Sequence, residues 1–235
     1  MSTTTTAPSV PQVLPAPDDA VAFRRAGAGC LLAAVACMLA GAITWATTGV
    51  DFDTAVETGT ATTLLADVDA NRGALQVAFL LWICATPFFA AAGGLLGRAF
   101  RDRPAGVAAG SLMVFGSAIA LLAFVGFETM TTAMAPLHAS VSHELATTVG
   151  HVTSRLDWIA TIAIVGVPPA LLSAINRQEW PRWISAVGFL APVAALLTVT
   201  AMVTGSGLAT YGVVLVPVGL LWSAAAGIRM LRSAA

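Results

Sequence analysis

The chain has no lysine, and charged residues of both signs make up only 10% of its 235 residues. Soluble domains typically carry about 25% charged residues. Hydrophobic residues account for 57% of the sequence, more apolar surface than a soluble fold of this length can bury. The excess is expected to face lipid. The net charge of -1 offers no electrostatic basis for binding nucleic acid, so no nucleic-acid partner is predicted.

Recognisable chemical motifs are also scarce. The three cysteines (Cys30, Cys37 and Cys84) lie in apolar runs without the paired spacing of a disulfide framework or metal site. We interpret them as small buried hydrophobic residues. The sequence contains no glycine-rich phosphate loop, serine nucleophile elbow, CxxC pair or EF-hand loop. No cofactor is therefore predicted.

Six apolar runs are each about 20 residues long, which is enough to cross a hydrocarbon core of about 30 Å. Their length and lack of alternation favour helices over strands. The last two are separated only by Gly205-Ser206. The runs span residues 26–48, 74–97, 105–127, 157–176, 183–204 and 207–228.

The first run follows Arg24-Arg25, as a signal-peptide core would, but it is longer than such cores usually are. We therefore expect it to be retained as a membrane span. Residues 1–23 begin with a stretch rich in Thr, Pro and Ala and are predicted to be a disordered cytoplasmic tail. Residues 24–235 are predicted to form one six-helix transmembrane domain.

Arginines are distributed unequally between the two sides of this six-span arrangement. One side holds nine and the other only Arg72 and Arg155. Short basic loops stay in the cytoplasm, so both termini are predicted to be cytoplasmic. The expected fold is an all-α polytopic protein of the cell membrane, with the lipid bilayer as its first partner. The nine arginines of the inner side are Arg24, Arg25, Arg98, Arg101, Arg103, Arg177, Arg182, Arg229 and Arg232.

Two outer loops are long, at residues 49–73 and 128–156, and long loops are often functional. The first is predicted to hold a short helix around residues 60–70. The second reads as an amphipathic helix that runs into the fourth span. The spans themselves carry no ionisable residue at a predicted midplane, which argues against a proton-coupled pump and against a transmembrane b-type haem protein.

The second outer loop gathers polar side chains that could bind a ligand or metal. On a continuous helix, Glu144, His151 and Arg155 would share one face. Histidines and carboxylates can ligate divalent metals, but the spacing matches no zinc motif. The alternative is a solvated polar face on an extracytoplasmic helix. The ligand or metal candidates are His138, His143, Glu144, His151, Arg155 and Asp157.

Glu128 is the single candidate for catalysis. It follows the third span directly, so it is expected near the outer membrane boundary and partly removed from water. Such a carboxyl could act as a general acid or contact a ligand. The alternative is an interface carboxylate hydrogen-bonded to Thr129, Thr131 or the loop.

Prolines and glycines interrupt the predicted spans. Proline removes a helix hydrogen bond, and broken helices occur at transporter binding sites. Gly106 and Gly110 have the spacing that lets membrane helices pack closely, which we expect to serve packing within the chain. The prolines within spans are Pro87, Pro168, Pro169, Pro192 and Pro217.

The fourth and fifth spans read RLDWIATIAIVGVPPALLSAINRQEWPRWISAVGFLAPVAALL. This stretch resembles a bacterial six-span membrane family of unknown function, whose members carry a similar Pro-Arg-Trp step, here Pro181, Arg182 and Trp183. The resemblance implies a fold and no reaction. Proline is favoured at helix starts, Arg at the cytoplasmic face, and Trp at the interface.

Three functions remain open from the sequence. The first is a non-enzymatic accessory, sensor or small-ligand-binding membrane protein, with a membrane or extracytoplasmic protein partner bound through residues 128–156. The second is a transporter of a neutral or apolar solute. The third is an intramembrane enzyme that acts on a lipid or isoprenoid with Glu128 as its acid. Known small membrane cyclases of this kind use paired acids, one of them in a late span, whereas the last two spans here have none.

Overall fold

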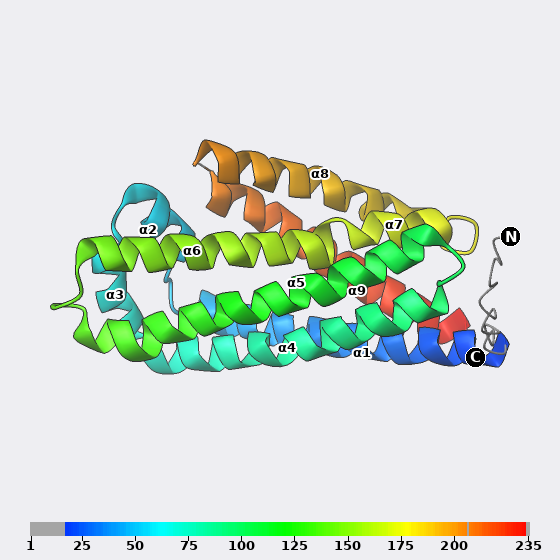
Figure 1. Cartoon of the computed structure of the whole chain (residues 1–235), viewed down its shortest axis with the longest axis horizontal. Helices are drawn as coiled ribbons and strands as arrows, with labels where there is room; N and C mark the ends of the chain where they lie inside the picture. Colours follow the sequence, from blue (N-terminus) through cyan, green and yellow to red (C-terminus); the bar gives the residue numbers. More distant parts are fainter. Residues whose placement is uncertain (1–16, 206, 234–235) are drawn as a thin grey trace, which may run out of the picture.

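The computed structural model describes residues 17–205 and 207–233, which are almost entirely helical and contain no strand. Six helices or helix runs in this part are long and apolar enough to span a membrane. They lie side by side along the long axis of the molecule (Figure 1). The helices are α1 (Pro17–Ala46), α2 (Phe52–Thr58), α3 (Ala61–Ala70), α4 (Arg72–Ala99), α5 (Pro104–Thr129), α6 (His143–Thr161), α7 (Pro168–Ile175), α8 (Arg182–Thr204) and α9 (Leu208–Ser233). Residues 1–16 of the predicted tail lie outside the described part, and α1 begins within that tail, at Pro17.

The third and fourth spans are longer than the sequence predicts. The π-helical turn η1 (Met130–Met134) and the 3-10 turn η2 (Ala135–Leu137) extend α5, so that the candidate span is Pro104–Leu137. The π-helical segment η3 (Ile162–Gly166) joins α6 to α7, giving a candidate span of His143–Ile175. At 1.5 Å per residue these are about 50 Å long, against a hydrocarbon core of about 30 Å. The amphipathic helix that was predicted to run into the fourth span is confirmed as the first part of α6, which begins at His143.

The excess length forms one wall of a cap, which consists of α2, α3 and residues 128–150. We call it the outer cap because the arginine distribution predicts that this end lies outside the cytoplasm. The helices α2 and α3 pack against α6 and the turns after α5 at one end of the molecule (Figure 1). The Asp51 side chain caps α2 by accepting a hydrogen bond from the Thr54 N–H at 3.0 Å. Gly59 ends α2 with a left-handed φ of 69°. The helix predicted around residues 60–70 is confirmed as α3, whereas α2 was not foreseen.

Prolines account for the irregular segments. Pro168 and Pro169 offer no backbone N–H, and the preceding turn widens, with Val167 N–H bonding the Ile162 carbonyl at 3.0 Å. In α4, Pro87 leaves the Ile83 carbonyl without its usual backbone donor. The Thr86 hydroxyl donates to that carbonyl instead, at 2.8 Å. These breaks are therefore locally compensated.

Small residues let the helices approach closely. A Cβ at Gly110 would lie 2.5 Å from the Gly93 carbonyl oxygen, so only glycine fits at this α4–α5 crossing. The expected packing role of the small residues is confirmed here within the chain. In α4, Trp82 reaches α1 and donates its indole N–H to the Met38 carbonyl at 3.1 Å.

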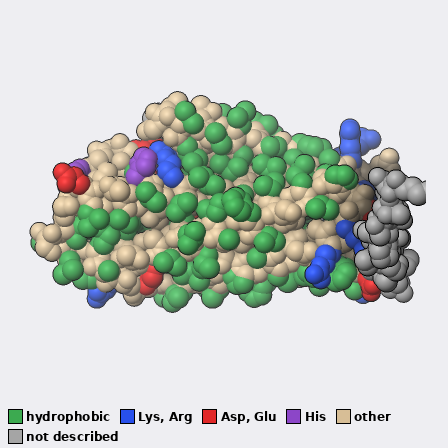
Figure 2. Space-filling model, in the orientation of Figure 1, with side chains coloured by type: hydrophobic (Ala, Val, Ile, Leu, Met, Phe, Trp, Pro, Cys, Tyr) green, Lys and Arg blue, Asp and Glu red, His purple; other side chains and the backbone are tan. Residues whose placement is uncertain are grey.

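Large apolar side chains are exposed along the helices. Ile43, Leu196 and Val203 have 69%, 65% and 83% of their surface exposed. Figure 2 shows hydrophobic side chains covering the middle of the molecule, with charged and histidine side chains gathered toward its two ends. Apolar surface of this extent belongs in lipid. The molecule is therefore an integral, multi-pass membrane protein.

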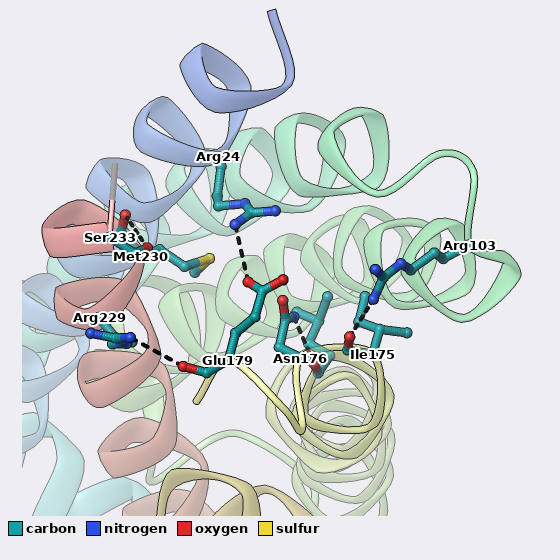
Figure 3. A network of polar contacts seen from close by, with 9 residues as sticks. Arg24, Arg103, Ile175, Asn176, Glu179, Arg229, Met230 and Ser233 are labelled. Carbon is teal, nitrogen blue, oxygen red and sulfur yellow. Dashed lines mark hydrogen bonds and ion pairs between the residues drawn. The ribbon is translucent and has the colours of Figure 1, made fainter. Parts of the chain in front are cut away.

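The end opposite the outer cap holds an arginine clamp around the α7–α8 turn (Figure 3). Arg24 of α1 forms an ion pair with Glu179 at 3.5 Å, and Arg229 of α9 donates to the Glu179 backbone carbonyl at 3.1 Å. Arg103 donates to the Ile175 carbonyl at the end of α7. The clamp thus ties α1, α9 and the α4–α5 turn to one short loop.

Tryptophans at this end differ in their surroundings. Trp183, of the Pro-Arg-Trp step, is 54% exposed, as expected of an interface anchor. Trp180 is buried instead, with its ring centroid 5.8 Å from that of Trp222. Trp222 is buried between helices and donates its indole N–H to the Ser173 hydroxyl at 2.9 Å.

Candidate functional site

The carboxyl of Asp53, on α2, makes polar contacts between the outer cap and the transmembrane bundle. It accepts a hydrogen bond from the Ser154 hydroxyl at 2.6 Å and another from the Trp158 indole N–H at 3.1 Å. Both donors lie on α6, four residues apart and hence on the same helix face. We call this set the outer latch. Charge-assisted hydrogen bonds of this kind are stronger than neutral ones.

The outer latch is held on the bundle side by close packing. The Trp158 ring is buried against α8 and α9, near Ala201 and Leu215. A Cβ at Gly212 of α9 would lie only 1.8 Å from the Trp158 ring, so the glycine makes room for the indole. The latch therefore has a fixed position near the outer ends of α8 and α9.

Asp157 lies beside the latch and lines a cavity of about 40 Å³ inside the bundle. Among the residues that the structure describes, none donates a hydrogen bond to this carboxyl, and no Arg or His lies within ion-pairing distance of it. The carboxyl of Asp53 is close enough to act on Asp157 electrostatically. The cavity is lined by Met38, Ala85, Thr86, Phe89, Ala120, Phe124, Asp157, Ala160, Thr161, Ile164, Val165, Val216 and Leu220.

The cavity lies beside one π-helical segment and two helices that contain an internal proline. Thr86 and Phe89 flank the proline break of α4, and Val216 directly precedes Pro217 of α9. Ile164 and Val165 belong to the π-helical segment η3. Such segments appear frequently at functional sites. The cavity thus combines one carboxyl, the hydroxyls of two threonines and apolar walls.

Its size limits what it can hold. A water molecule needs about 10–15 Å³ of such space, so the cavity has room for about three water-sized groups. Pockets for drug-sized ligands are about 300–1,000 Å³. The cavity in this structure therefore suits water, an ion or a molecule of a few heavy atoms.

Burial raises the pKa of the Asp53 carboxyl above its ordinary value of 3.8. The hydrogen bonds from Ser154 and Trp158 stabilise the charged form and oppose this change in pKa, while the nearby carboxylates of Asp51 and Glu57 reinforce it. The outer latch is therefore sensitive to protonation in principle, because its bonds are strongest when the carboxyl is charged.

The histidine candidates do not converge. His138, His143 and His151 are exposed on the outer cap, as is Glu144 at the start of α6. Within the described part of the chain, no three His, Cys, Asp or Glu side chains lie close enough to hold a metal ion. The structure brings none of these four side chains to the Asp157 cavity.

Glu128 and Arg155 also lie apart from the cavity lining. Glu128 accepts a hydrogen bond from the Gln76 side chain, and its Oε2 atom is buried without a hydrogen-bond partner among the described residues. Arg155 is half-buried and belongs to no ion pair between described residues. Of the seven candidate residues named from the sequence, only Asp157 borders the cavity.

A second hollow lies in the outer cap, between α2, α3 and the segment before α2. Its volume is about 330 Å³, and it is lined in part by Asp51, Thr54, Thr60, Thr63 and Asp67. The Asp51 carboxyl is engaged in capping α2, and the other polar side chains of the hollow are partly or fully solvent-exposed. The hollow therefore offers no buried polar group that would need a hydrogen bond from a ligand.

The sequence did not single out Asp53, Ser154 or Trp158 as site residues. The contacts of Asp53 with Ser154 and Trp158 join residues 101 and 105 positions apart, which no local pattern encodes. The adjacency of an acid and Trp at the predicted start of a span was the only local signal.

No family model, curated protein or solved structure matches the chain. The resemblance at the Pro-Arg-Trp step therefore supplies no family assignment. Functional inference rests on the geometry of the outer latch and the cavity beneath it.

Proposed function

We propose that this protein is a small-ligand-binding protein of the cell membrane, with its termini in the cytoplasm and its outer cap on the external side. The ligand would bind at Asp157, beneath the outer cap, and the protein would act as a sensor or accessory protein rather than as an enzyme. The observation that carries this proposal is Asp157, a partly buried acid that lines the cavity between the helices and has no hydrogen-bond partner among the described residues.

Two further features support the proposal. The outer latch lies next to the cavity, so undocking α2 would change access to Asp157 from the external side. The arginine clamp ties down the cytoplasmic end, where the basic residues concentrate. Access from the external side is therefore the route that the packing favours.

Thiol labelling tests this access. Thr161→Cys, in a background without the three native cysteines, places a thiol at the cavity wall. In intact cells, 2-sulfonatoethyl methanethiosulfonate, which does not cross the membrane, should label it slowly, and at least several-fold faster when Asp53→Asn weakens the latch. Ser140→Cys, on the exposed tip of the cap, is the matched control and should label at one rate in both backgrounds. Equal, negligible labelling of Thr161→Cys with and without the latch would exclude a ligand route under the cap.

A transporter is the second candidate, favoured by the π-helical segment η3 and the prolines within α4 and α9 around the cavity. The same thiol distinguishes the two functions. A transporter requires Thr161→Cys to react with an impermeant reagent added to either side of sealed vesicles. A sensor or binding protein requires reaction from the external side alone.

Two other hypotheses from the sequence have weaker support. A lipid or isoprenoid enzyme would depend on Glu128, which contacts Gln76 and lies outside the cavity lining. A protein partner would bind residues 128–156, where Leu137, Leu145 and Val152 are each more than half exposed on or near the outer cap. Exposed apolar residues of this kind are typical of docking surfaces when they form a patch.

A further inference from the structure

We infer that the ligand of the Asp157 cavity is a small organic monovalent cation, a protonated amine of about the size of methylammonium. This inference rests on the proposed ligand-binding function and names the chemical class that the cavity would select. It is carried by the charge, the size and the lining of the cavity.

The charge of the cavity is unbalanced. Asp157 supplies a carboxyl, Asp53 supplies a second one nearby, and no described Arg or His pairs with Asp157. Arg155 is only two residues from Asp157 on α6, a step that places the two side chains on different faces of a helix. An unpaired carboxylate in apolar surroundings is disfavoured, and either uptake of a proton or binding of a cation relieves it. The second of these is the state proposed for the occupied cavity.

The lining favours an organic cation over a metal ion. The hydroxyls of Thr86 and Thr161 and the carboxyl of Asp157 are the polar side-chain groups of the cavity wall. Calcium takes six to eight oxygen ligands, and magnesium demands an octahedral set. An ammonium group needs fewer acceptors, and the rings of Phe89 and Phe124, which also border the cavity, can attract a cation through their faces.

The size sets an upper limit on the ligand. With room for about three water-sized groups, the cavity admits ammonium or methylammonium, and larger amines require the walls to move. The apolar walls accommodate the methyl group, which a hydrated inorganic ion lacks. The negative field of Asp53 at the junction with the outer cap would also draw cations toward the site.

The test is binding of radiolabelled methylammonium to the full chain purified in detergent, measured by equilibrium dialysis. The expected result is saturable binding at one site per chain. The affinity should fall at least tenfold in Asp157→Asn. It should be unchanged in Glu144→Gln, which alters an exposed acid on the same helix. Unlabelled methylammonium should compete, whereas ethanol, a neutral molecule of similar size, should not.

Three outcomes separate the inference from the function on which it rests. Competition by ethanol, or full binding by Asp157→Asn, would overturn the cation class while leaving a ligand site in place. No saturable binding of methylammonium, with Thr161→Cys still reactive beneath the outer latch, would also overturn the cation class alone. No binding together with an unreactive Thr161→Cys would overturn both, and would leave a cavity filled by water.

Discussion

At the scale of single residues, Asp53 is the acceptor for two buried donors of α6. Asp53→Ala leaves the Ser154 hydroxyl and the Trp158 indole N–H buried without an acceptor. We expect a loss of about 1–3 kcal/mol of stability, the usual cost of orphaned buried donors. Thermal unfolding in detergent measures it. Asp67→Ala, an exposed acid of α3, is the control and should unfold as the native chain does.

The raised pKa of Asp53 predicts how stability changes with pH. Between its unfolded value near 3.8 and its higher folded value, the folded protein holds a proton that the unfolded chain has released. Stability contributed by this group is therefore greatest below that interval and falls as the pH rises through it. Melting temperatures from pH 4 upward should decline more steeply for the native chain than for Asp53→Asn. Parallel curves would show that another group governs the dependence.

Local sequence reasoning reached Asp157 but not its surroundings. It named the residue as a ligand candidate because it stood at the predicted mouth of a span, beside polar loop residues. The structure places it inside a 33-residue helix run, next to Asp53 from a different loop. Hydropathy depends on neighbours along the chain, whereas the environment of Asp157 depends on helices far away in sequence.

At the scale of elements, the contact between α6 and α9 depends on one glycine. Gly212→Ala would place a methyl group 1.8 Å from the Trp158 ring, which is buried and bonded to Asp53. We expect overpacking to cost about 1–3 kcal/mol and to disturb the outer latch. Melting temperature and the rate of Thr161→Cys labelling measure the two effects.

Gly94→Ala is the matched control for this substitution, because a Cβ on that residue of α4 meets no atom within 4 Å. It should leave both measurements at native values. If Gly212→Ala matched this control, the position of Trp158 in the structure would be incorrect, and with it the geometry of the latch.

The length of α6 shows that predicting a helix is different from predicting a membrane span. Residues 143–156 are too polar for a hydropathy window to include them in a span, although their amphipathic spacing did indicate a helix. The side chain of Ser142 caps this helix by accepting from the Leu145 N–H at 3.2 Å. Packing against α2 and α3 then extends the apolar environment beyond the span. The continuity of this helix was predictable from the sequence. The burial of its residues against α2 and α3 was not.

At the scale of the whole molecule, the lengths of the apolar runs were sufficient to predict an all-helical architecture with six candidate spans. Run lengths predicted six spans, and six helices or helix runs of the described residues meet that criterion. Arginine placement predicted the orientation, which stays a prediction. The concentration of arginines at the end opposite the outer cap, several of them in the clamp, agrees with the charge pattern from which it was inferred.

The proposed access of a ligand from the external side depends on the outer cap being outside the cell, and a topology map tests this directly. Single cysteines at Thr60, Ser140 and Ser233, in a background without native cysteines, are exposed to an impermeant thiol reagent in intact cells. The account predicts labelling at Thr60 and Ser140, with Ser233 protected until the membrane is opened. Labelling of Ser233, or protection of Ser140, would contradict it and would place the latch and the cavity on the wrong side of the membrane for an external ligand.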